Sequence, residues 1–126
     1  MNLPNNLKFT KDHEWLKIEG DKATIGVTDF AQSQLGDIVF VDVSTEGETL
    51  EKEETLGTIE AVKTVSDVYM PVSGEIIEFN EKLEDEAELI NKDPYGEGWI
   101  VKIILTNPEE INKLLTPEAY AKLIQA

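Results

Sequence analysis

The segment GTIEAVKTVSDVYMPVSG, residues 57–74, determines how we expect this chain to fold. β-branched residues are dense on both sides of Lys63, and such residues are enriched in strands. The sequence therefore predicts two strands, Thr55–Val62 and Val65–Met70, joined at Val62-Lys63-Thr64. This join contains no Gly, Asn or Pro, although tight hairpin turns usually recruit them. The prediction is an unusual hairpin that presents one lysine at its tip.

Extended segments also dominate the rest of the chain. Around the turn Glu19-Gly20-Asp21, two runs of strand-forming residues predict a second hairpin. Other strands are predicted where β-branched and aromatic residues cluster between turn-forming residues. The predicted strands outside the lysine hairpin are Trp15–Ile18, Lys22–Val27, Ile38–Val41, Glu75–Phe79 and Trp99–Leu105.

Three short helices are expected beside these strands. Thr28 can cap the first helix, and Gly36 can end it in the left-handed conformation. Near the end of the chain, Asn107-Pro108-Glu109-Glu110 offers a cap, a proline at the first helical position and a glutamate at the third. Thr116-Pro117-Glu118 repeats this arrangement before the run Ala119–Ile124. Both C-terminal helices are amphipathic, so we expect them to pack against the sheets.

A weak internal repeat relates two halves of the chain. Gly36–Asp42 is similar to Gly74–Asn80, and the same offset aligns Glu46-Gly47-Glu48 with Glu84-Asp85-Glu86. Each copy predicts a strand, a turn and a strand. Two such halves related by a pseudo-twofold axis would form a mainly β sandwich, in which each half supplies part of both sheets. A chance match between two strand-rich segments is the alternative. Lys63 falls in the segment that links the copies.

Length and composition indicate one ordinary globular domain. The chain has 126 residues, and we expect residues 1–126 to form a single domain with a hydrophobic core. Without cysteine there is no disulfide framework and no sign of an oxidising compartment. No apolar run is long enough to span a bilayer, and Met1–Asn6 matches neither a signal nor a transit peptide. These features predict a cytoplasmic protein.

The charge balance argues against two classes of partner. With 26 acidic and 11 basic side chains, the formal net charge is −15. Such a surface repels nucleic acid and anionic membranes. The charge can serve solubility alone, or it can steer the protein toward basic surfaces on protein partners. Charge by itself does not separate these two interpretations.

The residues needed for most enzyme sites are missing. His13 is the only histidine and there is no cysteine, which excludes a Cys/His zinc site. A Ser-His-Asp triad would require His13 itself, and no glycine-rich phosphate loop or calcium loop is present. A catalytic carboxylate pair remains possible, but so acidic a surface supplies such pairs by chance. The sequence therefore favours a protein that is not an enzyme.

Two interpretations of the tip lysine follow. Lys63 can be a solvated turn residue, as many exposed lysines are. Alternatively, an acyl chain on its amine would remove the charge and create a flexible tether. A protruding tip would let a modifying enzyme reach the amine, and tethering would raise the effective concentration of the carried group at each partner's site.

The hairpin resembles the lipoyl-lysine hairpin of the H proteins of the glycine cleavage system. The similarity extends from about Lys8 to Ile124, and several separate motifs occur in the family's order. Such a series is far more specific than a lysine hairpin alone. The motifs besides the hairpin are Lys11-Asp12-His13-Glu14-Trp15, Gly26–Gln32, Leu35–Val39 and Asn91–Trp99.

The resemblance implies a fold and a function. H proteins adopt a barrel-sandwich hybrid of two antiparallel sheets with flanking helices. Lys63 matches the lysine that carries covalent lipoic acid, one group per chain. The implied protein is a carrier that takes the aminomethyl group of glycine from the P protein (glycine decarboxylase) to the T protein (aminomethyltransferase). The L protein (dihydrolipoyl dehydrogenase) reoxidises the arm, and a lipoate-attaching enzyme is a further partner. A monomer suits such a carrier.

The resemblance also implies a cleft that shelters the loaded arm. An acid in such a cleft can pair with the amine of the cargo and keep water away. Glu14 and Asp67 match the positions we expect to serve this purpose, and the alternative for each is a solvated surface acid. His13 is expected to be structural. Glu60, near the tip, is a candidate for recognition by the lipoylating enzyme.

Several related interpretations stay open. A lipoyl domain of a 2-oxo acid dehydrogenase complex shares the hairpin, but the His-Glu-Trp segment and the C-terminal helices fit it poorly. A biotin carrier typically has methionines beside its lysine, whereas Val62 and Thr64 flank Lys63. An unmodified acidic binding module is a third possibility. A lipoyl donor for other proteins is a fourth, and the sequence does not separate it from the glycine role.

Overall fold

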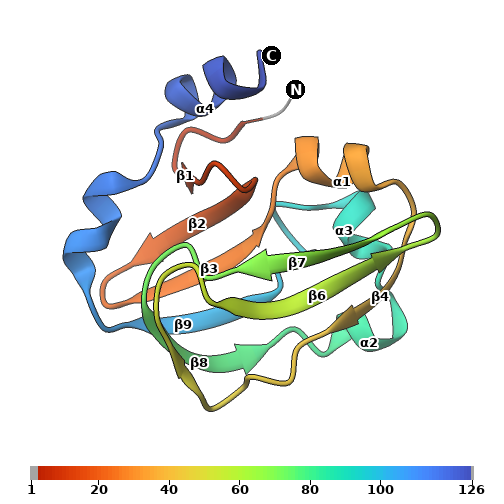
Figure 1. The fold of residues 1–126 in the computed structure, drawn as a ribbon, viewed down its shortest axis with the longest axis horizontal. Helices are drawn as coiled ribbons and strands as arrows, with labels where there is room; N and C mark the ends of the chain where they lie inside the picture. The colour runs from red at the N-terminus through yellow and green to blue at the C-terminus, as the bar shows by residue number, and fades with distance from the viewer. Residues whose placement is uncertain (1–2, 126) are drawn as a thin grey trace.

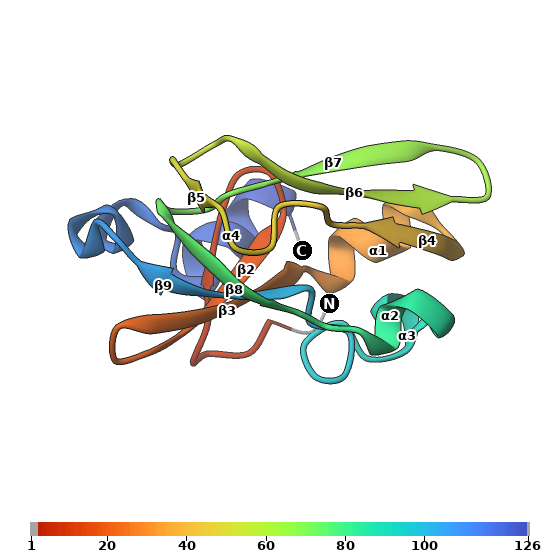
Figure 2. The ribbon, with the colours of Figure 1, turned by 90° about the horizontal axis from the view of Figure 1, so that it is seen from below.

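Two antiparallel sheets form the protein, as the sequence predicts. The computed structural model describes residues 3–125, so Met1, Asn2 and Ala126 of the predicted single domain lie outside the described residues. Figure 2 shows the two sheets as facing layers. The six-stranded sheet has the order β1 (Lys8–Phe9), β2 (Glu14–Glu19), β3 (Lys22–Val27), β9 (Val101–Leu105), β8 (Gly74–Phe79) and β5 (Thr49–Leu50). The three-stranded sheet has the order β4 (Ile38–Asp42), β6 (Thr55–Ala61) and β7 (Val65–Tyr69).

The main hydrophobic core lies between the sheets. Ile25, Ile76 and Ile103 contribute from the larger sheet, and Ile59 and Val68 contribute from the smaller one. All five side chains are at most 2% exposed. Burying such a side chain contributes about 1.5–3 kcal/mol to folding. The core therefore fixes the base from which the β6–β7 hairpin projects.

Helix α1 (Asp29–Leu35) begins and ends at the predicted residues. The Thr28 hydroxyl accepts a hydrogen bond from the amide of Ala31 at 3.1 Å. Gly36 follows with φ 81° and ψ −155°. The positive φ explains why glycine stands there, although the ψ lies outside the predicted left-handed helical conformation. This helix connects β3 to β4 and lies beside the end of the β6–β7 hairpin (Figure 1).

Two further short helices were not predicted. Helices α2 (Lys82–Asp85) and α3 (Leu89–Lys92) lie between β8 and β9, where the internal repeat predicts only a turn. Each buries one apolar side chain, Leu83 or Ile90. Four residues are too few to show a helical period in the sequence. The repeat therefore holds for β4 and β8 but fails after them, and these two strands belong to different sheets.

The first C-terminal helix differs from its prediction. Pro108–Lys113 forms a 3-10 helix (η1), and the predicted cap is wrong because the Asn107 side chain makes no capping hydrogen bond. Glu110, the intended partner in that cap, instead accepts hydrogen bonds from the amide and hydroxyl of Ser73, at 2.6 and 3.1 Å. A tertiary contact has replaced the local one.

Helix α4 (Pro117–Ile124) forms as predicted and closes a second, smaller core. The Thr116 hydroxyl caps it by accepting from the Ala119 amide at 3.1 Å. Tyr120 is fully buried and stacks on Phe9, with ring centroids 4.8 Å apart. This contact holds the C-terminal helix against the start of the larger sheet. No helix within residues 3–125 is both long and apolar enough to cross a membrane.

Candidate functional site

Lys63 lies at the tip of the β6–β7 hairpin, which reaches beyond the body of the protein (Figure 1). Main-chain bonds close the tip without any glycine. The Ala61 amide donates to the Thr64 carbonyl at 2.8 Å, and the Val62 amide donates to the Asp37 carbonyl at 3.0 Å. The second bond ties the tip to the residue before β4. The hairpin is thus a fixed support rather than a free loop.

The Lys63 amine is available for reaction. Its side chain is exposed, and within residues 3–125 it makes no ion pair and no side-chain hydrogen bond. The stem of the lysine passes close to the end of α1, because a Cβ added to Gly36 would lie 3.4 Å from the Lys63 Cε. A group attached to the amine would therefore start beside α1.

A groove opens at this place. It has a volume of about 290 Å³ and lies between α1, β7 and the loop before β2, and we call it the α1–β7 groove. Leu35, the residue before Gly36, contributes to it, so the groove begins next to the lysine stem. Its apolar lining is Val27, Phe30, Ala31, Leu35, Ile59 and Val68, and its polar lining is Asp12, His13, Glu14, Gln34, Ser66 and Asp67.

Glu14 is a buried acid, not a solvated one. Its residue is only 2% exposed, although it lines the groove. One carboxyl oxygen accepts from the Thr10 hydroxyl at 2.7 Å, and the other accepts from the Tyr69 amide at 3.2 Å. Burial raises the pKa of Glu14 to about 7 despite these two bonds. Near neutral pH this carboxyl is close to its midpoint, so a nearby cation would draw it into the ionised form.

Asp67 lines the same groove from its rim. The residue is exposed on β7, where it pairs with Thr58. The structure thus brings Glu14 and Asp67, distant in sequence, to one groove. The exposure of Asp67 keeps its carboxylate in contact with water, whereas Glu14 is withdrawn from it. Glu60 is exposed on β6, opposite Phe40, and does not line the groove.

His13 forms part of the groove wall in an unusual backbone conformation. Its φ of 69° is rare for a residue with a side chain. The ring Nδ1 lies 2.8 Å from the Tyr120 hydroxyl, which lies 2.8 Å from the Thr28 hydroxyl. Burial lowers the pKa of His13, which favours the neutral form of the ring. These contacts support the structural role expected for His13.

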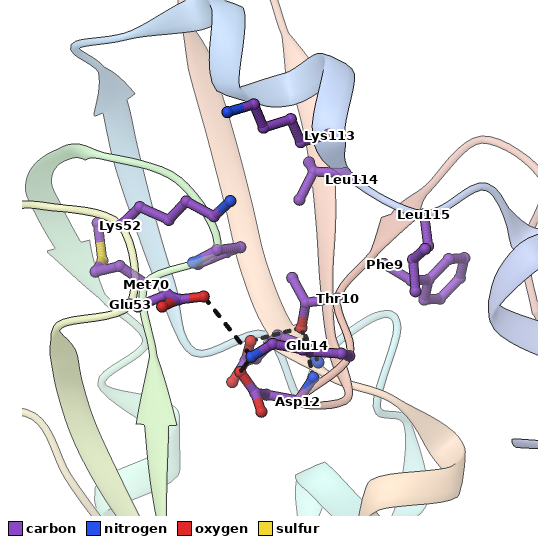
Figure 3. A pocket seen from close by; sticks show the side chains of 12 residues that line it. Phe9, Thr10, Asp12, Glu14, Lys52, Glu53, Met70, Lys113, Leu114 and Leu115 are labelled. Atoms are coloured by element: carbon purple, nitrogen blue, oxygen red, sulfur yellow. Dashed lines mark hydrogen bonds and ion pairs between the residues drawn. The ribbon is translucent and has the colours of Figure 1, made fainter. Parts of the chain in front are cut away.

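Sequence reasoning missed two residues that shape the site. Thr10 holds the Glu14 carboxyl, and Tyr120 links His13 to the cap of α1. Figure 3 shows Thr10 beside Glu14. Thr10 and Glu14 are four residues apart on either side of a turn, and this spacing could have predicted their hydrogen bond. The contact of Tyr120 spans 107 residues and had none.

No group of three or more His, Cys, Asp or Glu side chains in the described part of the chain could hold a metal ion. The arrangement offers one free amine at a projecting tip, and beside it an apolar groove that contains acids. Such a pair can anchor a long acyl chain and accommodate a cationic end group.

Comparisons with known proteins identify relatives over almost the whole chain. A family model described as glycine cleavage H-protein matches residues 7–126. The glycine cleavage system H protein of Bacteroides fragilis is 56% identical over all of both chains, and that of Bacteroides thetaiotaomicron is 57% identical over 98% of each. The crystal structure of a glycine cleavage system H protein from Mycobacterium marinum has a TM-score of 0.90 and 38% identity, covering 98% of this chain and 100% of that chain.

Proposed function

This chain belongs to the glycine cleavage H-protein family and is a lipoyl carrier of the glycine cleavage system, and we propose that Lys63 holds its lipoyl group. The observation that carries this proposal is the free amine at the tip of a hairpin held by main-chain bonds. An enzyme that attaches lipoate needs an amine that projects from the surface. Within residues 3–125, Lys63 meets this need without breaking any ion pair.

The α1–β7 groove has the chemistry that a lipoyl arm requires. When bound, the lipoyl group supplies a disulfide that accepts the aminomethyl group of glycine. Phe30, Leu35 and Val68 offer an apolar surface to the arm, and Glu14 and Asp67 offer anionic groups to the amine of the cargo. The groove starts beside the stem of Lys63.

Glu14 and Asp67 have different parts in this proposal. Glu14 is buried, so a charge-assisted bond from its carboxylate to the cargo amine would be little screened by water. Because its pKa is about 7, the arriving positive charge would favour loss of its proton to solvent. Asp67 lies exposed at the rim and would attract the amine more weakly. His13 positions the groove wall and transfers no proton.

The proposed partners are the P, T and L proteins and a lipoate-attaching enzyme. Around the tip, a small apolar patch could meet them. A register irregularity between Ile38 and Phe40 leaves two consecutive apolar residues of β4 exposed near the hairpin tip. The patch consists of Val39, Phe40, Val62 and Val65. Together with the net charge of −15, this patch suits docking sites that have an apolar centre surrounded by basic residues.

We further propose that residues 1–126 act as one domain, as a monomer in the cytoplasm, and carry the cargo without catalysing the reactions themselves. The hydrophobic cluster between the sheets and the smaller cluster under α4 share β2, because Leu16 belongs to the first and Trp15 to the second. This supports a single folding unit.

The direct test of the attachment site is intact-mass analysis of protein made in its native host, followed by peptide mapping. We expect one lipoyl group per chain, on the peptide that contains Lys63. An unmodified Lys63 in lipoate-replete cells, or lipoyl on another lysine, would contradict the assignment. A biotin mass at Lys63 would contradict it as well.

A further inference from the structure

Glu14 also lines a second cavity (Figure 3), and the lysine at the hairpin tip is not part of its lining. Its volume is about 200 Å³. Four separate segments line it: the loop before β2, the turn before β6, the residues after β7 and the end of η1. We call it the Lys52 pocket. The residues that matter for its chemistry are Lys11, Lys52, Lys113, Met70, Pro71 and Leu114.

Three lysines and three acids line the Lys52 pocket. The lysines are three of the 11 basic residues of this acidic chain. Lys11 is already paired, with its Nζ 3.2 Å from the Asp12 carboxylate and 3.7 Å from that of Glu53. Glu14, at the back of the pocket, accepts hydrogen bonds from a hydroxyl and an amide. The acids of the pocket therefore already have partners.

Two ammonium groups remain without a partner. Neither Lys52 nor Lys113 makes an ion pair or a side-chain hydrogen bond in the part of the chain that the structure describes. Both side chains extend over the pocket in Figure 3. The lining also contains Asp12, Glu14 and Glu53, so it is the two unpaired ammonium groups, not the summed charge, that can bind an anion.

The rest of the lining selects the kind of anion. Met70 is buried, and Pro71, Leu114 and Leu115 add further apolar surface. An inorganic oxyanion would leave this surface uncovered and would place its full charge near Glu14. A carboxylate with an aliphatic chain would cover the apolar surface and keep its charge at the lysines.

We propose that the Lys52 pocket binds an aliphatic monocarboxylate, with its carboxylate on Lys52 and Lys113 and its chain on Met70, Pro71 and Leu114. Binding does not require the lipoyl group, so it is independent of the assignment of Lys63. Asp12 and Glu14 line both this pocket and the α1–β7 groove. The two cavities therefore share the acid that we propose holds the cargo.

Amide NMR of the full chain, with and without the lipoyl group, tests this proposal. Sodium hexanoate is titrated at constant ionic strength, with chloride as the balancing anion. We expect saturable shifts at the amides of Thr10, Glu14, Met70 and Leu114. The double variant Lys52→Gln/Lys113→Gln should weaken hexanoate about tenfold or more, while its spectrum reports whether it is folded.

A matched double variant removes the same charge elsewhere. Lys17 and Lys22 are exposed on the β2–β3 hairpin and line neither cavity, so Lys17→Gln/Lys22→Gln should bind hexanoate like the original chain. Shifts that never saturate, equal binding by the Lys52→Gln/Lys113→Gln variant, or binding of inorganic phosphate as tight as that of hexanoate would overturn the proposal. Each of these results leaves the mass analysis of Lys63 unaffected.

Discussion

The hairpin tip and the Glu14 carboxyl belong to one carrier but are built in opposite ways. The tip is exposed and local in sequence: Val62 is 75% exposed, and Ala61 and Thr64 close the turn. Glu14 is 2% exposed and depends on a partner 55 residues away, the amide of Tyr69. An attachment point must be reached by other proteins, whereas an acid that shelters a cargo must be kept from water. The chain separates these demands by placing the lysine beside the groove and Glu14 in the groove's lining.

The largest effect should come from the tip itself. Lys63→Arg keeps the positive charge but removes the amine that we propose is acylated, so lipoylation should disappear and glycine decarboxylation with the P protein should fall to background. Mass analysis and carbon dioxide release from glycine measure the two outcomes. Lys17→Arg, at an exposed position of β2, serves as the control. Activity that persists in Lys63→Arg would refute the assignment.

For stability, in contrast to function, the base of the hairpin should matter more than its tip. Ile59, at the base of the hairpin, is 1% exposed, so Ile59→Ala should lower the free energy of unfolding by about 2–5 kcal/mol. Val62→Ala, at the tip of the same hairpin, should change it by about 0.5 kcal/mol or less. Denaturant titration of both variants provides the comparison. Equal losses would mean that the tip is packed more firmly than its exposure indicates.

The pH dependence of stability should reveal the buried acid. The pKa of Glu14 is raised from 4.5 to about 7 in the folded state, so between these values the folded state binds more protons. The protonated carboxyl therefore contributes stability that is fully present below pH 4.5 and is lost as the pH rises through about 7. The loss amounts to about 3 kcal/mol.

Glu14→Gln should remove this part of the pH dependence. The unfolding free energy of the original chain minus that of Glu14→Gln should fall by about 3 kcal/mol between pH 4 and pH 8. Glu60→Gln, exposed on β6, controls for the loss of one acidic group. A difference that stays constant with pH would contradict the raised pKa.

The smallest effects should distinguish the two acids of the groove. Glu14→Gln should shorten the lifetime of the aminomethyl cargo by about tenfold, since a buried charge-assisted hydrogen bond contributes about 1.5–3 kcal/mol. Asp67→Asn should shorten it only a few-fold, because exposed pairs contribute about 0.2–1 kcal/mol. The rate of formaldehyde release from the loaded protein gives both values. An unchanged lifetime in Glu14→Gln would remove Glu14 from the proposed shelter.

The same contrast explains how much the sequence could predict. The two hairpins, α1 and α4 follow from residues close together in the chain, such as Thr28 and Gly36 around α1, and their prediction is confirmed. The cap at Asn107 failed because Glu110 found a partner at Ser73. Local patterns predict local contacts, and they fail where a distant group competes.

The candidate site could be predicted in part for the same reason. Lys63 stands out from its neighbours alone, and the family resemblance indicated Glu14 and Asp67. Neither source predicted that Glu14 is buried, because its burial depends on segments that meet only in the folded chain. The Lys52 pocket is the extreme case, since four separate segments form it.

The bond between His13 and Tyr120 has a consequence for the order of assembly. It joins residues 107 positions apart, and Tyr120 also contacts the hydroxyl that caps α1. When Leu105 at the end of β9 is added to the growing chain, every strand of the described residues has been synthesised but Tyr120 has not. The β6–β7 hairpin closes from contacts near in sequence, which form quickly, whereas the groove wall must wait for Tyr120. A nascent chain thus presents its lysine before it possesses a finished shelter for the cargo.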